Sequence, residues 1–291
     1  MTINQTRIVL FSIGLAAFLA SGIGFLFRGE RITVPAVSIR GESYEYRDTG
    51  IYRYSAERVV QEGIGWDAVT FFLVVPAYWG VLFLSRRLEV RETLFLIGFL
   101  SYFVYQYLEY TMFWALGPLF PLHLVLFSSS MAGILILLSR IRIKELPGYF
   151  SDRFPLKGVG WISAFMGVVL LGMWVPFVYR ALQGDIAGKL YGSTTLVVQA
   201  LDLGLIVPLA FWTAFACKQK KSVAYLLSTI MVVKLITMGS ALCAMILNVW
   251  REGGRFEGVP LGIFGSGVLY GLWLINKIYR SYQSEKEAIS R

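Results

Sequence analysis

Four ionisable side chains lie inside long apolar segments of this 291-residue sequence: Glu109, His123, Asp202 and Lys234. A charged group is costly in hydrocarbon, so in a membrane helix it usually faces a protein interior or a water-filled cavity. At a rise of about 1.5 Å per helical residue, Asp202 and Lys234 reach a similar depth on consecutive antiparallel helices, which predicts an ion pair. Glu109 and His123 flank a short turn, where a carboxylate beside an imidazole can share or relay a proton.

Helical spacing extends this group into three polar stripes, because residues at i, i+4 and i+7, or at i and i+3, share a helix face. The stripes are Tyr102, Gln106 and Glu109; Thr195, Gln199 and Asp202; and Lys234 and Thr237. They are expected to meet in the outer half of the membrane, which predicts a solute-binding site. The alternative is that these groups hold helices in register through an ion pair and interhelical hydrogen bonds, with no ligand.

Composition predicts the elements that must position these side chains. Only 15% of the residues are charged and 56% are hydrophobic, whereas a soluble domain is about a quarter charged. Apolar runs of about 20 residues span a bilayer core as helices. The predicted spans are 8–27, 66–85, 93–116, 118–139, 159–179, 194–217, 222–248 and 259–276. The sequence therefore predicts an all-α integral membrane protein with about eight transmembrane helices, forming a single polytopic domain over 1–291.

The distribution of basic residues predicts the orientation. The N-terminus, segments 86–92, 140–158 and 218–221 and the C-terminal tail hold 16 Lys and Arg, and the alternate segments hold 10. Short cytoplasmic loops carry the basic excess, so both termini are expected on the cytoplasmic side of the plasma membrane. The first span exceeds a signal-peptide core in length and is expected to be retained. The net charge of +9 then reflects topology and contact with membrane lipids, and no nucleic-acid partner is expected.

The longest predicted extracytoplasmic segment covers residues 28–65. Alternating aromatic residues on both sides of Asp48-Thr49-Gly50 predict a small β-hairpin between spans one and two. Ser55 is expected to cap a short amphipathic helix that follows. This segment is interpreted as a lid on the outer surface, and the alternative is a cap that binds a protein partner or substrate.

Spans two and three resemble spans six and seven in layout. In each pair an aspartate near the outer end is followed by a proline and, ten residues after the proline, by a basic inner turn. The matching residues are Asp67 and Asp202, Pro76 and Pro208, and Arg86 and Lys218. Eight spans divide into two sets of four with the same orientation, so a 4+4 parallel repeat is possible. The alternative is a pattern that unrelated membrane helices share.

The sequence indicates no cofactor and no metal. Its two cysteines, Cys217 and Cys243, lack the spacing of a disulfide framework or a zinc site. A single histidine is too few for a multi-haem cytochrome. No phosphate-binding loop, zinc-protease helix or serine-hydrolase elbow is present.

Two stretches resemble a known group of sequences: residues 196–208, which contain Gln199, Asp202 and Pro208, and the aromatic run 102–110. They are similar to a group of prokaryotic multi-pass membrane proteins, and the similarity extends from the second span onward. It implies no activity. A lysine in a late helix is also a feature of retinal proteins, with Asp202 as the counter-ion of Lys234, but the rhodopsin helix signatures are missing.

Three functions remain open. The first is a transporter or permease-like protein for a small polar or ionic solute, with Asp202, Lys234, Gln199 and Gln106 lining the site. The second is a structural, assembly or sensor subunit whose outer hairpin binds a partner. The third is a membrane enzyme on a lipid-linked substrate, with Glu109 and His123 as acid and base. An enzyme is the less favoured class, and the sequence assigns no solute.

Overall fold

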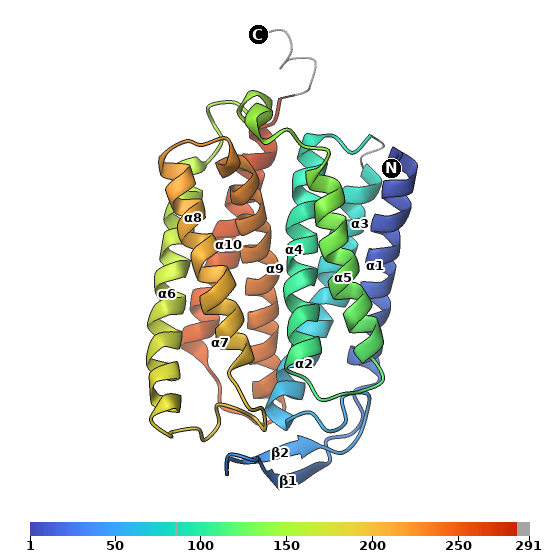
Figure 1. Ribbon diagram of the computed structural model, residues 1–291, viewed down its shortest axis with the longest axis vertical. Coiled ribbons are helices and arrows are strands. Elements are labelled where there is room, and N and C mark those ends of the chain that lie inside the picture. Colours follow the sequence, from blue (N-terminus) through green and yellow to red (C-terminus); the bar gives the residue numbers. More distant parts are fainter. Residues whose placement is uncertain (85–86, 284–291) are drawn as a thin grey trace.

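The computed structural model describes residues 1–84 and 87–283 as a helical bundle with a small sheet at one end (Figure 1). The helices are α1 (Ile3–Leu26), α2 (Glu57–Val69), α3 (Val75–Leu84), α4 (Val90–Met112), α5 (Phe120–Leu138), α6 (Leu156–Leu182), α7 (Val197–Leu201), α8 (Val207–Lys218), α9 (Val223–Arg251) and α10 (Gly258–Ser281). The π-helical segment η1 (Thr70–Val74) joins α2 to α3, and η3 (Asp202–Ile206) joins α7 to α8. A 3-10 segment, η2 (Ile143–Tyr149), follows α5.

Seven helices of the described chain are long and apolar enough to cross a membrane. They are α1, α2–η1–α3, α5, α6, α7–η3–α8, α9 and α10. These helices are consistent with a multi-pass membrane protein. The remaining long helix, α4, has 23 residues, but its second half carries Gln106, Glu109 and several tyrosines, so it is less apolar than the others. It lies at the centre of the bundle between α5 and α9, where its residues are mostly buried.

The first residues of α1 and the last residues of α10 lie at the same end of the bundle, which we call the terminal end (Figure 1). The sheet lies at the opposite end, which we call the hairpin end. Helices α4 and α9 are in contact at the centre, and α2 packs along α9. Helix α6 packs mainly on α8, and α10 packs on α9. The bundle therefore has two outer helices, α6 and α10, that do not pack along each other.

The β-hairpin forms within the predicted segment but with a different turn. Strand β1 (Thr33–Val37) pairs antiparallel with β2 (Ser43–Arg47), with Thr33 opposite Arg47. The turn is at residues 38–42, and the predicted turn at Asp48-Thr49-Gly50 follows β2. The backbone of Arg47 exchanges hydrogen bonds with Ser55 and Tyr54, so residues 48–54 form a loop that folds back on the end of β2.

The second membrane-length helix begins at Glu57 rather than at residue 66. Ser55 does not cap it, since the Ser55 Oγ accepts a hydrogen bond from the backbone of Ala115 instead. The predicted short amphipathic helix is thus the first part of α2 and continues into η1 and α3. Position 85, the basic residue Arg86 and residues 284–291 of the predicted tail lie outside the described residues.

Candidate functional site

Two helices of the bundle change locally from α to π geometry at corresponding places. Segment η1 ends two residues before Pro76, and η3 ends two residues before Pro208. Proline lacks a backbone N–H and its ring crowds the carbonyl four residues earlier, so the helical hydrogen-bond ladder is disturbed there. Single π turns are frequent at functional sites. Asp202 is the first residue of η3, which places one of the predicted site residues at such a turn.

A cavity of about 410 Å³ lies between α2, α4, α6, η3, α9 and α10. This volume is in the range of small-molecule sites. Most of its wall is apolar and comes from α6, α9 and α10. The polar and ionisable residues of the wall are Arg58, Glu62, Tyr105, Glu109, Lys189, Tyr191, Gln199, Asp202, Lys234 and Glu257. The cavity therefore combines a long apolar wall with a compact polar part.

Asp202 and Lys234 both line this cavity, but Tyr105 lies between them. One carboxylate oxygen of Asp202 accepts a hydrogen bond from the Tyr105 hydroxyl at 2.7 Å, and the other accepts one from the Trp174 indole at 2.7 Å. The Lys234 Nζ lies 3.7 Å from the centroid of the Tyr105 ring, which is cation–π geometry. Among the described residues no ion pair or hydrogen bond joins Asp202 to Lys234, so the expected direct pair is not formed.

The Lys234 ammonium is buried and lacks a hydrogen-bond partner in the described part of the chain. Glu109 also lines the cavity, and no hydrogen bond to its carboxylate is found among the described residues. An ammonium has three donors, and a buried donor without an acceptor is costly. The polar part of the cavity thus holds a cation and a carboxylate that are free to contact a ligand.

Glu109 and His123 lie on different sides of α4. The His123 ring stacks on the Tyr107 ring and packs edge-on against Tyr110, with centroids 5.6 and 5.0 Å apart. Within the described chain no bond joins His123 to Glu109, and His123 Nε2 is buried without a partner. Successive residues of a helix point about 100° apart, so Tyr107 and Tyr110 lie on the side of α4 that meets α1, α2 and His123 of α5, while Glu109 faces the cavity. The predicted acid–base pair is therefore not formed.

Two further predicted residues belong to a buried network outside the cavity. The Trp66 indole donates a hydrogen bond to the Tyr102 hydroxyl at 2.9 Å. The Thr70 hydroxyl donates to the Gln106 carbonyl oxygen at 2.9 Å and lies 2.7 Å from the Tyr102 hydroxyl. Tyr102 and Gln106 have no exposed surface. They connect α4 to α2 and η1, which is the packing role that buried polar groups often have between membrane helices.

The predicted site residues thus separate into two groups. Those that line the cavity are Glu109, Gln199, Asp202 and Lys234. Those that lie elsewhere are Tyr102, Gln106, His123 and Thr237, and the Thr237 hydroxyl donates to the carbonyl of Val233 on its own helix. The polar stripes do not converge on one point, because one part of the α4 and α9 stripes lines the cavity and the other part bonds elsewhere.

The cavity also contains residues that the sequence analysis missed. Arg58 donates to Glu62 at 2.6 Å and to Glu257 at 3.2 Å, and all three line the cavity. Their signal was the i, i+4 spacing of Arg58 and Glu62 on the short helix expected after Ser55; it did not show that this helix continues into the bundle. Tyr105 had the same kind of signal, because it precedes Glu109 by four residues. Trp174 had none, since a tryptophan in a membrane helix is common near an interface.

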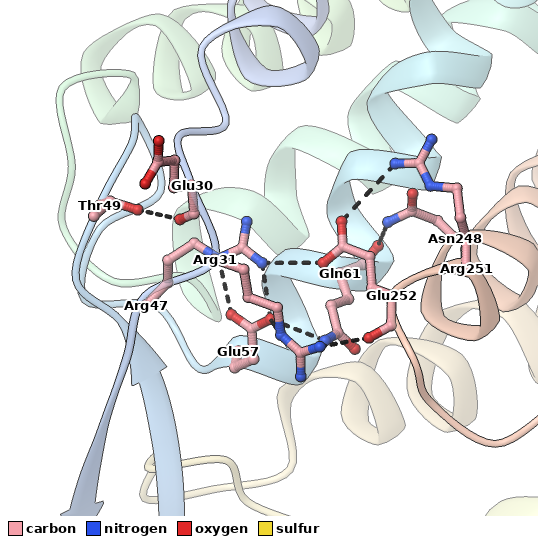
Figure 2. A network of polar contacts seen from close by, with 9 residues as sticks. All are labelled: Glu30, Arg31, Arg47, Thr49, Glu57, Gln61, Asn248, Arg251 and Glu252. Carbon is pink, nitrogen blue, oxygen red and sulfur yellow. Dashed lines mark hydrogen bonds and ion pairs between the residues drawn. The ribbon is translucent and has the colours of Figure 1, made fainter.

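The hairpin is attached to the bundle by a buried ionic network (Figure 2). Arg47 is 1% exposed and donates two hydrogen bonds of 2.8 Å to the Glu57 carboxylate at the start of α2. It also donates to Glu252, after α9, at 3.2 Å. Burial lowers the pKa of the Arg47 guanidinium, but the hydrogen bonds and charges of Glu57 and Glu252 outweigh it and raise the pKa above its usual value. Arg31 adds an ion pair with Glu57 at 3.0 Å.

The other end of the hairpin is attached to the loop between α6 and α7. The Glu42 carboxylate is buried and accepts hydrogen bonds from the backbone N–H groups of Lys189, Leu190 and Gly192 at 3.1 to 3.2 Å. Tyr191 and Gly192 have φ of 51° and 83°, and such left-handed turns point successive N–H groups at an anion. Because Lys189 and Tyr191 line the cavity, the hairpin and this loop cover its hairpin end.

Comparison of the chain with models of known families, with curated proteins and with solved structures finds no match.

Proposed function

We propose that the protein is a permease-like carrier of the plasma membrane and that its solute binds in the cavity. One observation carries the proposal: the Lys234 ammonium, 5% exposed, lies in the cavity wall without a hydrogen-bond partner among the described residues. Glu109 and Asp202 line the same cavity. A ligand that accepts a hydrogen bond from Lys234 offsets the cost of burying this charge.

The two ends of the bundle differ, which supports a carrier. At the terminal end, the rings of Phe150, Phe154 and Tyr225 pack together with centroids 4.6 to 5.4 Å apart. The cavity instead reaches the charged residues Arg58 and Glu257 at the hairpin end. A cavity that is closed at the terminal end and is lined by charged residues under the hairpin at the other end is consistent with one state of alternating access. The basic excess in the loops at the terminal end orients the hairpin end outward.

The proposed 4+4 repeat is supported by the two π segments. With Pro76 matched to Pro208, the counterpart of Asp202 is Thr70 rather than the predicted Asp67, since Thr70 begins η1 and Asp202 begins η3. Thr70 contacts Tyr102, which is 32 residues later, and Lys234 follows Asp202 by the same interval in the sequence. Helices α4 and α9, which carry Tyr102 and Lys234, are in contact at the centre. Carriers with internal repeats bind their solutes where the halves meet, at interrupted helices.

The other two functions have less support. A membrane enzyme with Glu109 and His123 as acid and base requires the two side chains to share a substrate, and α4 separates them. A purely structural role fits Tyr102, Gln106 and Thr70, whose groups bond one another. It does not explain a buried ammonium that faces a cavity.

Water access tests whether the cavity is a binding site. In a background without Cys217 and Cys243, single cysteines replace Gln199 in the cavity wall and Gln106 in the dry network. A membrane-impermeant thiol reagent should label Gln199→Cys and leave Gln106→Cys unlabelled. Ser43→Cys, at an exposed position of the hairpin, is the positive control. Failure to label Gln199→Cys while Ser43→Cys reacts would remove the basis of the proposal.

Transport is tested in proteoliposomes loaded with a low-molecular-mass extract of the cells that express the protein. Mass spectrometry identifies compounds that leave wild-type vesicles. The same compounds should stay in vesicles with Lys234→Met or Asp202→Asn, provided that these variants keep the wild-type melting temperature. If no compound distinguishes the wild type from protein-free vesicles, the protein is not a carrier of the solutes in that extract and the proposal fails for them.

A further inference from the structure

The apolar part of the cavity is long and follows one helix. On α6 its residues run from Ile162 to Phe177, which at about 1.5 Å per residue is roughly 22 Å. They are Ile162, Phe165, Met166, Val169, Leu170, Met173, Trp174 and Phe177. Trp174 bonds Asp202, so the remaining apolar wall extends from the polar site toward the terminal end. A compact polar solute does not need such a wall, whereas an alkyl chain does.

The cavity is open sideways between α6 and α10. Phe165, Met173 and Ile263 line it and are nevertheless 55%, 41% and 43% exposed. Residues that line a cavity and also face the outside mark an opening in its wall. Helices α6 and α10 are also the least buried of the seven apolar helices. In a bilayer, this opening faces the acyl chains of the lipids.

The two helices approach each other near the terminal end. There Gly158 of α6 lies beside Tyr270 and Leu274 of α10. Toward the hairpin end they have no substantial contact, because α6 packs on α8 and α10 on α9. The opening therefore lies beside the polar site rather than at the terminal end of the bundle. A molecule can enter through it from the lipid with its polar end at Lys234.

The polar site selects the type of head group. Lys234 supplies donors, and Glu109 supplies an acceptor. Both oxygens of Asp202 already accept hydrogen bonds. Glu109 and Asp202 line the same cavity as Lys234, so a doubly charged phosphate there is repelled by two carboxylates. A compact head with a single negative charge or none, such as a carboxylic acid, fits better.

We propose that the solute is a membrane-borne single-chain amphiphile with a carboxylic-acid type of head, which reaches Lys234 through the opening between α6 and α10. This inference rests on the proposed function, since it names the class of solute that the same cavity takes. The chain lies along α6, and Lys234 holds the head.

Photo-crosslinking in phosphatidylcholine nanodiscs tests the proposal. One probe is hexadecanoic acid with a diazirine near the end of the chain, and the other is the hexadecyl phosphate with the same diazirine. Mass spectrometry maps the labelled peptides. The acid should label residues 162–177 and 260–267 several-fold more than the phosphate does. Leu15 and Leu19 of α1, which are exposed, provide an internal measure of ordinary lipid contact.

Two pairs of variants make the test specific. Lys234→Met should reduce the labelling of α6 and α10 by roughly tenfold, as expected for the loss of one charge-assisted hydrogen bond, with no change on α1. Met166→Trp fills the apolar wall while leaving the polar groups in place, and it should have a similar effect. Val168→Trp, on the outward face of the same helix, is the matched control and should label like the wild type.

The outcomes separate this inference from the proposed function. Equal labelling by both probes that is unaffected by Lys234→Met and Met166→Trp would mean ordinary lipid contact and would overturn the inference. If neither probe labels α6 or α10 above the level on α1 while Gln199→Cys reacts with the thiol reagent, the inference fails and the proposed carrier stands for a water-soluble solute. If neither reaction occurs, both fail.

Discussion

The attachment of the hairpin to the bundle gives a stability prediction that can be worked out from the network in Figure 2. The perturbation is Arg47→Met, which keeps most of the side-chain volume and removes the charge. Arg47 is fully buried and bonds both Glu57 and Glu252. Its removal leaves two carboxylates at a site built for a guanidinium.

Removing one partner from a buried ion pair typically costs about 3–5 kcal/mol, because the remaining charge is uncompensated. Here Glu57 keeps two partners, the half-exposed Arg31 at 3.0 Å and Gln61 at 2.9 Å. The cost is therefore expected near the lower limit, about 3 kcal/mol. At roughly 2–4 °C per kcal/mol for a chain of this size, the melting temperature should fall by about 6–12 °C.

The assay is thermal unfolding of the purified protein in detergent, followed by intrinsic tryptophan fluorescence. Arg53→Met is the matched control, because Arg53 pairs with Asp48 at 2.8 Å at an exposed site. Exposed pairs contribute little to stability, so this variant should melt with the wild type. Adding Glu57→Gln to Arg47→Met should restore part of the loss. If Arg47→Met melts as Arg53→Met does, the network does not hold the hairpin and the reasoning is wrong.

Two more predictions concern packing and pH. A Cβ at Gly65 would lie 2.6 Å from the carbonyl oxygen of Ala244 on α9, so Gly65→Ala should lower the free energy of unfolding by about 1–3 kcal/mol. Gly172→Ala is the control, because a Cβ there has no atom within 4 Å and should not destabilise α6. Equal melting temperatures of the two variants would contradict this prediction. Burial, and then the charge of Asp67, raises the pKa of the Tyr52 phenol well above 10. The stability that the neutral phenol contributes is therefore fully present below pH 10, and it is lost as the pH rises further. The Tyr52→Phe variant should therefore be less stable than the wild type at pH 8, by about 1–2 kcal/mol, and this difference should shrink by pH 11; a difference that does not change with pH would refute the assignment.

Hydrophobic runs were sufficient to predict most of the helices, because length and apolarity decide which segments can span a bilayer. They did not predict that the short amphipathic helix after Ser55 continues into the second span. Residues 57–65 contain Glu57, Arg58 and Glu62, which are too polar to count as part of a membrane-spanning run. In the structure Gln61 accepts a hydrogen bond from Asn248 of α9 at 2.7 Å, and Gly65 packs against the α9 backbone. This tertiary contact extends the helix, and no local signal contains it.

The polar stripe on α4 shows a second limit of sequence patterns. The spacing of Tyr102, Gln106 and Glu109 places them on one side of the helix. It does not say which neighbour that side contacts. Helix α4 is buried nearly all around, so Tyr102 and Gln106 meet η1 while Glu109, one turn further on, meets the cavity. Periodicity predicts a shared face, and only the packing of the neighbouring helices divides it.

The position of Tyr105 bears most directly on the choice between a carrier and a structural subunit. A direct Asp202–Lys234 pair would use the donors of Lys234 and leave little for a ligand. Instead, Tyr105 and Trp174 occupy both oxygens of Asp202 with neutral donors. The face of the same tyrosine ring stabilises Lys234 without using its hydrogen-bonding capacity. Tyr105 thus separates the two opposite charges and leaves the donors of the Lys234 ammonium available. A ligand-binding site needs such free donors, whereas an ion pair that only holds two helices together does not.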